Sequence, residues 1–349
     1  VSIEGKKTKM SHKVFIQSES ISFDIKPSQT ILEAAIAAGI NIPFGCRNGG
    51  CGSCKGKVLS GEVFCEEYQQ SAMTDEEKAN GSTLCCQSYV SSDVRLEIKL
   101  NKANDPLHES KITPVRVEAL TKLSHDVMKM LLKLPGNSTL KFTAGQYLEF
   151  IMADGSRRAF SIASPPHQEL IELHLRLIDG GKFTNFVFEE MQEKSIHRIE
   201  APIGQFYLRD SEKPIIFISG GTGFAPIKSV IEDMIHRDIK RTTYLYQGVR
   251  AEKDLYMHEL CLGWQKEHQH IHYIPVFSEP EKTDNQSIRT GLVHQAVLDD
   301  FQSFENYQAY SCGAPIVVQT AFNALVEKGL LEDEFFADAF TFAPPKNKI

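Results

Sequence analysis

The chain has 349 residues, 42% hydrophobic and 24% charged, and its 38 basic and 45 acidic residues give a net charge of −7. This composition is typical of a globular chain of two or three domains, and the acidic balance argues against a nucleic-acid partner. No apolar run approaches the roughly 20 residues of a membrane-spanning helix. The polar first ten residues lack the apolar segment of a signal peptide, so we expect a cytoplasmic location.

The eight cysteines are unevenly distributed, since six of them fall between Cys46 and Cys86. In a reducing compartment, clustered cysteines indicate metal or redox chemistry rather than a disulfide framework. Cys46, Cys51 and Cys54 follow the C-x4-C-x2-C spacing of plant-type 2Fe-2S sites, and Cys85 and Cys86 are both candidates for the fourth ligand. A zinc site usually contains two C-x2-C pairs, and this region contains one. The residues therefore favour a 2Fe-2S cluster.

The first predicted domain covers residues 11–101. Residues 12–27 alternate as a β-hairpin does, and residues 94–100 alternate again. Residues 30–39 indicate a short helix that stops at a glycine. We expect residues 1–10 to be an N-terminal extension outside this domain. The polar residues 102–111 are expected to form a linker.

Short β-like runs dominate residues 112–209, which predicts a small antiparallel barrel. One run consists of Arg158, Ala159, Phe160 and Ser161 and resembles an Arg-x-Tyr-Ser flavin motif. The chemistry fits this resemblance, because an arginine can clamp a phosphate, an aromatic ring can lie against the flavin and a hydroxyl can hydrogen-bond to it. Alone, these four residues also fit an ordinary strand. A following helix start can bind a pyrophosphate through backbone N–H groups and a hydroxyl, at Gly181, Lys182 and Thr184. We expect FAD rather than FMN.

From residue 210 to residue 349, strand-like and helix-like runs alternate. This alternation predicts a parallel sheet with helices on both faces. Gly221, Thr222 and Gly223 lie between the first strand and the first helix of this region. Glycines let a pyrophosphate approach the backbone, and the helix N-terminus favours its charge. The region is therefore predicted to bind a dinucleotide.

Together, these segments resemble the ferredoxin–NADP reductase superfamily. Its flavin motif Arg-x-Tyr-Ser is matched with Phe160 in place of tyrosine, and its Gly-Pro-x-Gly-x-Phe turn is matched at 201–206 with alanine first. Its Gly-Gly-x-Gly-x-x-Pro loop corresponds to residues 220–226. The resemblance implies a multidomain α+β and α/β chain. Its parts would be a β-grasp 2Fe-2S ferredoxin domain, a Greek-key β-barrel flavin domain and a Rossmann-like nucleotide domain.

The resemblance also implies roles for single residues. It selects Cys86 as the fourth cluster ligand and places Arg250 near the adenosine ribose. It places Cys312 and Gly313 beside the nicotinamide, so that Ser161 and Cys312 would lie next to the reacting rings. The acidic residues at 252 and 254 oppose the 2′-phosphate of NADPH, although the basic residues at 250 and 253 could hold one; we therefore expect NADH.

The three cofactor sites imply an electron path. NADH delivers two electrons at once, a 2Fe-2S cluster takes one at a time, and a flavin can do both. We expect transfer from NADH to FAD to the cluster and then to a separate acceptor protein. The domain order resembles the reductase components of bacterial oxygenases. Residues 220–229, 271–276, 291–300 and 335–340 are more similar to CDP-6-deoxy-Δ3,4-glucoseen reductases, which would make the acceptor a dehydrase of 3,6-dideoxysugar synthesis.

Other functions remain open at this point. Residues 247–250 and 254–256 look more like oxygenase reductases, so a mono- or dioxygenase component is the alternative acceptor. A free flavin or ferric reductase would use the last two domains, but it needs no cluster. A non-enzymatic iron–sulfur sensor would need no nicotinamide site.

Overall fold

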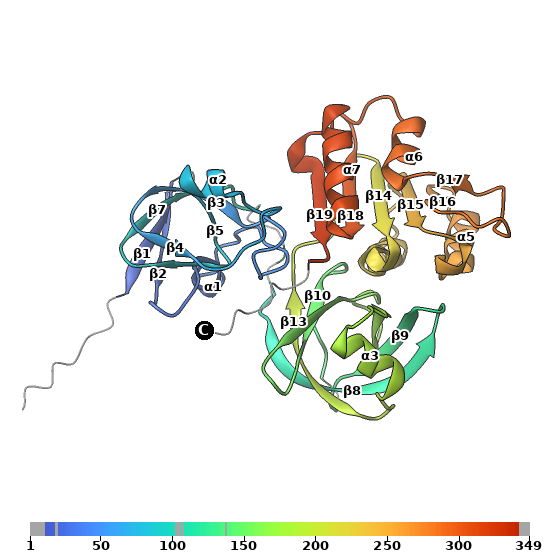
Figure 1. Ribbon diagram of the computed structural model, residues 1–349, viewed down its shortest axis with the longest axis horizontal. Coiled ribbons are helices and arrows are strands. Elements are labelled where there is room, and N and C mark those ends of the chain that lie inside the picture. Colours follow the sequence, from blue (N-terminus) through green and yellow to red (C-terminus); the bar gives the residue numbers. More distant parts are fainter. Residues whose placement is uncertain (1–10, 18–19, 102–105, 107, 137, 342–349) are drawn as a thin grey trace, which may run out of the picture. The chain divides into compact units, whose positions relative to one another are not determined.

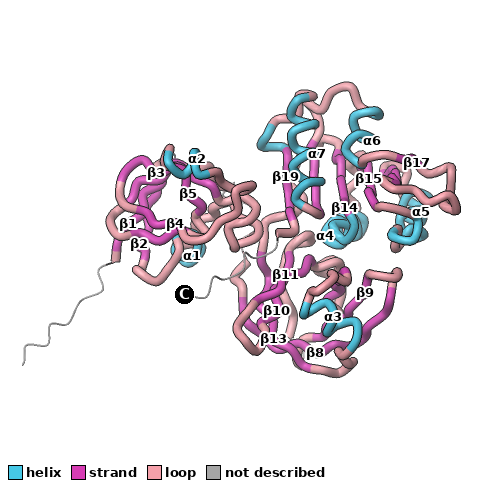
Figure 2. The backbone as a smooth tube through the Cα atoms, in the orientation of Figure 1, coloured by secondary structure: helices cyan, strands magenta, loops and turns pink. Residues whose placement is uncertain are grey.

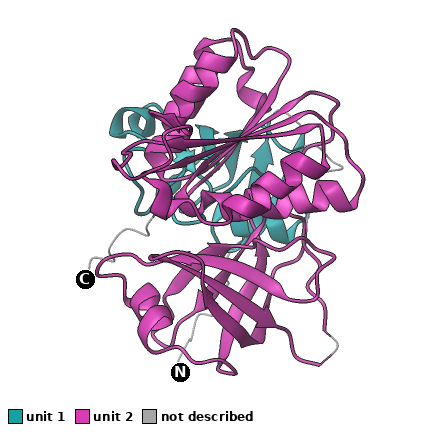
Figure 3. Cartoon of the chain, turned by 90° about the vertical axis from the view of Figure 1, so that its right-hand side faces the viewer, with its two compact units in different colours: residues 1–107, 341–349 teal, residues 108–340 magenta. Residues whose placement is uncertain are grey.

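The computed structural model describes residues 11–17, 20–101, 106, 108–136 and 138–341. The chain forms two compact units, residues 1–107 with 341–349 and residues 108–340 (Figure 3). The expected N-terminal extension, residues 1–10, lies outside the described residues, as do residues 102–105 and 107 of the expected linker. Among the described helices, none has both the length and the apolar character that crossing a membrane requires.

The first unit contains a five-stranded mixed sheet in the order β2-β1-β7-β3-β5 (Figure 1). The predicted hairpin is confirmed as the antiparallel pair β1 and β2, while β1 and β7 are parallel. Thr30 caps α1 through a capping box with Glu33, which explains where this helix begins. The mixed sheet and its helix agree with the predicted β-grasp fold. The elements are β1 (His12–Ile16), β2 (Ile21–Ile25), α1 (Ile31–Ala37), β3 (Lys55–Ser60), β4 (Val63–Cys65), α2 (Asp75–Ala79), β5 (Ser82–Leu84), β6 (Ser88–Val90) and β7 (Val94–Glu97).

The flavin half of the second unit is a six-stranded antiparallel sheet in the order β11-β10-β13-β8-β9-β12. The prediction of a barrel needs one correction. Among the described strands, the edge strands β11 and β12 meet at an isolated bridge between Ile162 and Leu173 rather than in a continuous pairing. Pro165 and Pro166 follow and lack the N–H that would extend it. The elements are β8 (Lys111–Lys122), β9 (Val127–Lys133), β10 (Tyr147–Ile151), β11 (Arg157–Ser161), β12 (Ile171–Arg176), α3 (Lys182–Glu189) and β13 (Ile196–Ile203).

The nucleotide half of the second unit is a six-stranded sheet in the order β17-β16-β15-β14-β18-β19, with every pairing parallel (Figures 1 and 2). Helices α4 and α5 share one apolar core with it, and α6 and α7 share another. The predicted parallel sheet with helices on both faces is confirmed. Its elements are β14 (Ile215–Gly220), η1 (Gly221–Gly223), α4 (Phe224–His236), β15 (Thr243–Val249), η2 (Glu252–Asp254), α5 (His258–Glu267), β16 (Ile271–Phe277), β17 (Arg289–Thr290), α6 (Val293–Asp300), β18 (Gln308–Gly313), α7 (Pro315–Glu327), η3 (Glu332–Glu334) and β19 (Phe335–Ala339).

Candidate functional site

The four predicted cluster ligands lie together in the first unit. The loop between α1 and β3 carries three of them, and Cys86 comes from the turn between β5 and β6. The thiols of Cys46 and Cys51 are hydrogen-bonded to each other, as are those of Cys54 and Cys86. The hydrogen bond from Cys46 lowers the pKa of the Cys51 thiol below its ordinary value. Two pairs of sulfurs fit two irons that each take two thiolates.

Backbone N–H groups of this loop already point at the sulfurs. The amide of Gly50 donates to Cys46 Sγ over 3.2 Å, and the amide of Cys46 donates to Cys51 Sγ over 3.4 Å. Such hydrogen bonds stabilise the negative charge of thiolate ligands. The donor set and its surroundings therefore suit a 2Fe-2S cluster.

The two candidates for the fourth ligand have different surroundings. Cys85 is fully buried in the apolar core, and burial raises the pKa of its thiol well above the ordinary value. Cys86 is hydrogen-bonded to Cys54 instead. The hydrogen bond to another predicted ligand favours Cys86 as the fourth ligand, whereas Cys85 is fully buried.

Two glycines explain why the cluster loop can be so tight. Gly49 has a φ of +74°, and a Cβ on it would lie 2.7 Å from the backbone oxygen of Glu67. Gly52 has a φ of +78°, and its Cβ would lie 3.0 Å from the backbone oxygen of Ala72. A side chain at either position would be strained and crowded.

The predicted flavin residues lie on β11 next to the start of α3. The ring of Phe160 is 5.4 Å from that of Phe183 and 6.0 Å from that of Phe150. This contact brings strand β11, which carries Arg158, next to the first turn of α3. Ser161 ends the strand and is 7% exposed. The strand and the helix start that the sequence assigned to one ligand are therefore neighbours.

The hydroxyl of Thr184 has a different partner from the one expected. It accepts a hydrogen bond from the Ile178 amide and donates to the Gly181 carbonyl, both over 3.2 Å. It therefore holds the loop before α3 in shape. Gly181 is the N-cap of this helix and Lys182 is its first residue. A pyrophosphate would be bound by the backbone N–H groups of this first turn.

The two dinucleotide motifs, nearly 90 residues apart in the sequence, contact each other through their backbones. Turn η1, which comprises Gly221, Thr222 and Gly223, follows β14 directly. A Cβ on Gly223 would lie 2.0 Å from the Cys312 oxygen, and one on Gly313 would lie 2.8 Å from the Gly220 oxygen. Only glycine fits at these close approaches.

The side chain of Cys312 is more deeply buried than we expect for a residue that touches the nicotinamide. Its side chain is fully buried, and burial raises the pKa of its thiol well above the ordinary value. It stays a neutral thiol within the apolar core that includes Tyr310 and Phe336. Contact between this thiol and a nicotinamide requires the side chains that cover it to move.

Arg250 forms a two-pronged ion pair with Asp254. Its Nε lies 3.0 Å from Oδ2 and its Nη2 lies 2.8 Å from Oδ1. The Asp254 side chain is only 5% exposed, so this carboxylate holds the guanidinium at the end of β15. The predicted ribose-binding arginine is thus fixed in place by a carboxylate of its own loop.

Arg176 is a functional candidate that sequence reasoning missed. Its Nη1 lies 2.8 Å from the position a Cβ on Gly221 would occupy, so the guanidinium lies against the dinucleotide loop. Its Nε donates to Asp126 Oδ2 over 2.8 Å. The residue ends β12 in the flavin half, where the sequence offers no sign that a lone arginine reaches the other half.

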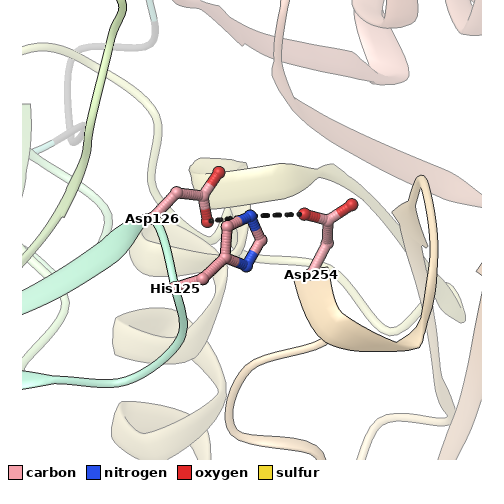
Figure 4. A group of neighbouring side chains, drawn as sticks. All are labelled: His125, Asp126 and Asp254. Carbon is pink, nitrogen blue, oxygen red and sulfur yellow. Dashed lines mark ion pairs between the residues drawn. The ribbon is translucent and has the colours of Figure 1, made fainter.

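His125, Asp126 and Asp254 place three possible metal-ligand atoms within 4.8 Å of one another (Figure 4). The ring of His125 lies 3.8 Å from Asp126 and 3.5 Å from Asp254. Arg250 also approaches Asp126, at 3.6 Å. Arg176 and Arg250 therefore already balance both carboxylates and would repel a cation. We assign this group to an ion network that joins the two halves of the second unit.

Comparison with protein families identifies three domains in this order. Residues 14–91 match the 2Fe-2S iron–sulfur cluster binding domain, residues 114–207 the oxidoreductase FAD-binding domain, and residues 217–322 the oxidoreductase NAD-binding domain. The expected cofactors, a 2Fe-2S cluster, FAD and NAD, agree with these families.

Similar proteins span nearly the whole chain. A CDP-6-deoxy-L-threo-D-glycero-4-hexulose-3-dehydrase reductase from Yersinia pestis is 36% identical over 333 residues, 95% of this chain and 99% of the relative. A terephthalate 1,2-dioxygenase reductase component from Comamonas sp. is 33% identical over 337 residues, which are 96% of this chain and 99% of the relative. The crystal structure of the Amycolatopsis cytochrome P450 reductase GcoB has a TM-score of 0.81 and 28% identity, covering 95% of this chain and 100% of that one. The chain therefore belongs to the iron–sulfur flavoprotein reductases, electron-transfer oxidoreductases that join a 2Fe-2S domain to FAD- and NAD-binding domains.

Proposed function

We propose that this reductase takes electrons from NADH and passes them through FAD and the 2Fe-2S cluster to a separate CDP-6-deoxy-4-hexulose 3-dehydrase. The observation that carries the proposal is the 36% identity, across 95% of the chain, to a relative named as the reductase of that dehydrase. The motifs at 271–276, 291–300 and 335–340 support the same assignment.

The contacts described above support the following residue roles. The cluster is held by Cys46, Cys51, Cys54 and Cys86. The flavin is bound by residues 158–161 and by the helix start at Gly181, Lys182 and Thr184, with Ser161 nearest the reacting ring. The dinucleotide is bound by residues 221–223, Arg250, Cys312 and Gly313, to which we add Arg176. We propose domain boundaries at 11–101, 112–209 and 210–349.

The choice of NADH is supported by the pairing of the basic groups near the expected ribose site. Arg250 is held by Asp254, and the Lys253 ammonium is paired with Glu281. A 2′-phosphate would have to displace these carboxylates and would also meet their negative charge. NADH has no such phosphate, so the same site accepts it without breaking either pair.

A second candidate acceptor is an oxygenase component. The Comamonas relative, 33% identical, is named as a dioxygenase reductase component, and residues 247–250 and 254–256 resemble those of oxygenase reductases. The two candidates differ in their need for oxygen. The dehydrase pathway consumes reducing equivalents without oxygen, whereas an oxygenase requires it.

The deciding experiment follows NADH oxidation under anaerobic conditions by the complete reductase, with purified dehydrase and a CDP-4-keto-6-deoxyhexose. We expect NADH loss that requires the reductase, the dehydrase and the sugar nucleotide together. Rapid NADH-driven reduction of a dye, without any loss that depends on dehydrase and sugar, would contradict the dehydrase assignment and favour the oxygenase component.

A further inference from the structure

A buried lysine connects the nucleotide half to the flavin half of the second unit. Lys228 lies on α4 and is only 4% exposed. Its Nζ donates to the Ala163 carbonyl over 3.2 Å and to Glu232 Oε2 over 2.9 Å, and it lies 3.4 Å from Glu172 Oε1. A buried ammonium is costly unless it is paired and hydrogen-bonded, and this one has both kinds of partner.

The next residue of the helix repeats the connection. Ser229 is fully buried, and its hydroxyl donates to the Ser164 carbonyl over 2.7 Å. The Ser164 hydroxyl in turn accepts from the Glu172 amide over 3.0 Å. Two consecutive residues of α4 therefore donate hydrogen bonds to two consecutive backbone carbonyls of the flavin half.

The segment that accepts these hydrogen bonds and the helix α4 that donates them each lie next to a proposed cofactor site. Ala163 and Ser164 follow β11, the strand of the flavin motif, which ends at Ser161, with only Ile162 between them. Helix α4 begins directly after the dinucleotide turn Gly221–Gly223. The hydrogen bonds from Lys228 and Ser229 therefore span the short distance between the two binding elements.

A second connection runs beside the first. The His174 ring, on β12, is hydrogen-bonded to Glu172 Oε1 at 2.7 Å and to the Tyr256 hydroxyl of the nucleotide half at 3.2 Å. Burial opposes ionisation of Glu172, but the hydrogen bond to His174 and the charge of Lys228 outweigh it and lower the pKa of this carboxyl to about 2. The carboxylate is therefore charged at neutral pH, as the buried ammonium requires.

We propose that Lys228 and Ser229 are positioning residues, which fix the dinucleotide turn relative to the flavin strand so that nicotinamide and flavin meet at the distance hydride transfer needs. The inference rests on the proposed transfer from NADH to FAD. In that reaction the hydride leaves the nicotinamide with both bond electrons, giving NAD⁺, and the flavin gains the hydride and one proton from solvent. Reacting atoms must come within about 3–3.5 Å, and a shift of about 1 Å can cost roughly 100-fold in rate.

A purely stabilising role explains these contacts less well. An apolar residue of similar volume would avoid the desolvation cost of the Lys228 ammonium, and buried ion pairs are often no more stabilising than such a replacement. Directional hydrogen bonds to two named carbonyls instead fix how the halves are oriented. The proposal therefore concerns the position of the dinucleotide turn relative to the flavin strand.

The test compares four variants of the full chain, each loaded with its cofactors: Lys228→Met, Lys228→Arg, Ser229→Ala and Lys240→Met. Lys240 is 69% exposed and serves as the matched control. The rate of flavin reduction at saturating NADH is measured by rapid mixing, together with NADH affinity, flavin content and backbone hydrogen exchange at residues 161–164.

We expect Lys228→Met to slow flavin reduction at saturating NADH at least tenfold, with little change in NADH affinity or flavin content, and to speed exchange at residues 161–164. Ser229→Ala should act in the same direction more weakly, Lys228→Arg should recover part of the rate, and Lys240→Met should match the wild type. If Lys228→Met does not fold, Ser229→Ala decides the question.

Unchanged reduction and exchange in Ser229→Ala and in any folded Lys228→Met protein would overturn the proposal, as would a loss confined to NADH affinity. Failure of NADH to reduce the wild-type flavin would instead contradict the proposed function itself, so the two failures are distinguishable.

Discussion

The neighbouring residues Cys85 and Cys86 have the same side chain, and we expect them to have different roles. Cys85 and Cys86 follow β5, yet Cys85 is enclosed in the core of the first unit, while Cys86 is hydrogen-bonded to Cys54 in the cluster loop. Burial raises the pKa of the Cys85 thiol, and the hydrogen bond to Cys54 together with burial raises the pKa of the Cys86 thiol. The expected division of roles therefore rests on the contact between Cys86 and another predicted ligand, Cys54, rather than on the acidity of the two thiols.

Replacing each cysteine in turn tests this division. Cys86→Ser should lose the 2Fe-2S cluster, with at least a several-fold fall in bound iron and sulfide, and yet retain NADH-driven dye reduction through the flavin. Cys85→Ala should keep the cluster and lose about 1–2 kcal/mol of stability, because it removes a buried sulfur. Equal iron and sulfide contents in the two proteins would contradict the ligand assignment.

The carboxylate of Asp254 is the residue on which the expected preference for NADH depends. Asp254→Asn should free Arg250 to bind a 2′-phosphate and raise kcat/KM for NADPH relative to NADH by roughly tenfold, in line with one hydrogen bond to a charged group, worth about 1.5–3 kcal/mol. Asp299→Asn, which weakens a different arginine pair, is the control. An unchanged ratio of the two kcat/KM values would contradict this role.

The residues that escaped prediction are those whose role depends on distant partners. The C-x4-C-x2-C spacing and the Gly-Gly-x-Gly loop are local patterns, so the sequence identifies them directly. Arg176 looks like a solvated charge at a strand end, and its approach to Gly221 arises only when the two halves of the second unit pack together. The burial of Cys312 also depends on strands that are remote in the sequence.

At the scale of elements, the dinucleotide site depends on how closely β14 and β18 approach. These strands pair in parallel, with Ser219 opposite Cys312, so their carboxyl ends bring turn η1 against the Cys312 backbone. The gap holds no side chain, since a Cβ on Gly223 would lie 2.0 Å from the Cys312 oxygen. The sheet pairing therefore determines the shape of the loop that we propose binds the dinucleotide.

A pair of glycine replacements tests this close approach. Gly223→Ala should lower the free energy of unfolding by about 1–3 kcal/mol and weaken NADH binding, because backbone rather than a flexible side chain must move. Gly263→Ala is the matched control, since no atom lies within 4 Å of its added Cβ. That change, inside α5, should stabilise the protein by up to about 1 kcal/mol. Similar urea midpoints for the two variants would contradict the packing argument.

The elements differ in how well the sequence predicts them. The alternation from β14 to α7 follows from local apolar runs and was predicted as a parallel sheet. Strand β19 was missed, because Phe335–Ala339 is a short, half-buried segment whose strand character depends on pairing with β18. The bridge between Ile162 and Leu173 also joins remote residues, so the incomplete pairing of the barrel could not be predicted.

At the scale of the whole molecule, the buried polar network makes stability depend on pH. Burial lowers the pKa of His174 below its ordinary 6.5, despite the hydrogen bond that the ring donates to Glu172, and Lys228 and Lys129 lower it further. The unfolded chain therefore binds a proton that the folded chain excludes. The contribution of His174 to the free energy of unfolding is therefore fully present above about pH 6.5 and is lost as the pH drops below that value. The low pKa of Glu172, about 2, adds a further loss below pH 4.5.

Comparing His174→Gln with the wild type measures this effect. The free energy of unfolding of the wild type should fall more steeply between pH 7 and pH 5 than that of the variant, because the variant has lost this proton-linked group. The other histidines titrate equally in both proteins and cancel from the comparison. Identical slopes would show that His174 does not exclude a proton in the folded state.

The central claim is that electrons pass from NADH through the flavin to the 2Fe-2S cluster within one chain. The most direct measurement mixes the anaerobic holoprotein rapidly with NADH and follows flavin absorbance and the electron paramagnetic resonance of the reduced cluster. The account predicts that the flavin is reduced first and the cluster second, and that flavin-free protein leaves the cluster oxidised. Cluster reduction by NADH at the same rate without flavin, or no cluster reduction in the complete protein, would contradict it.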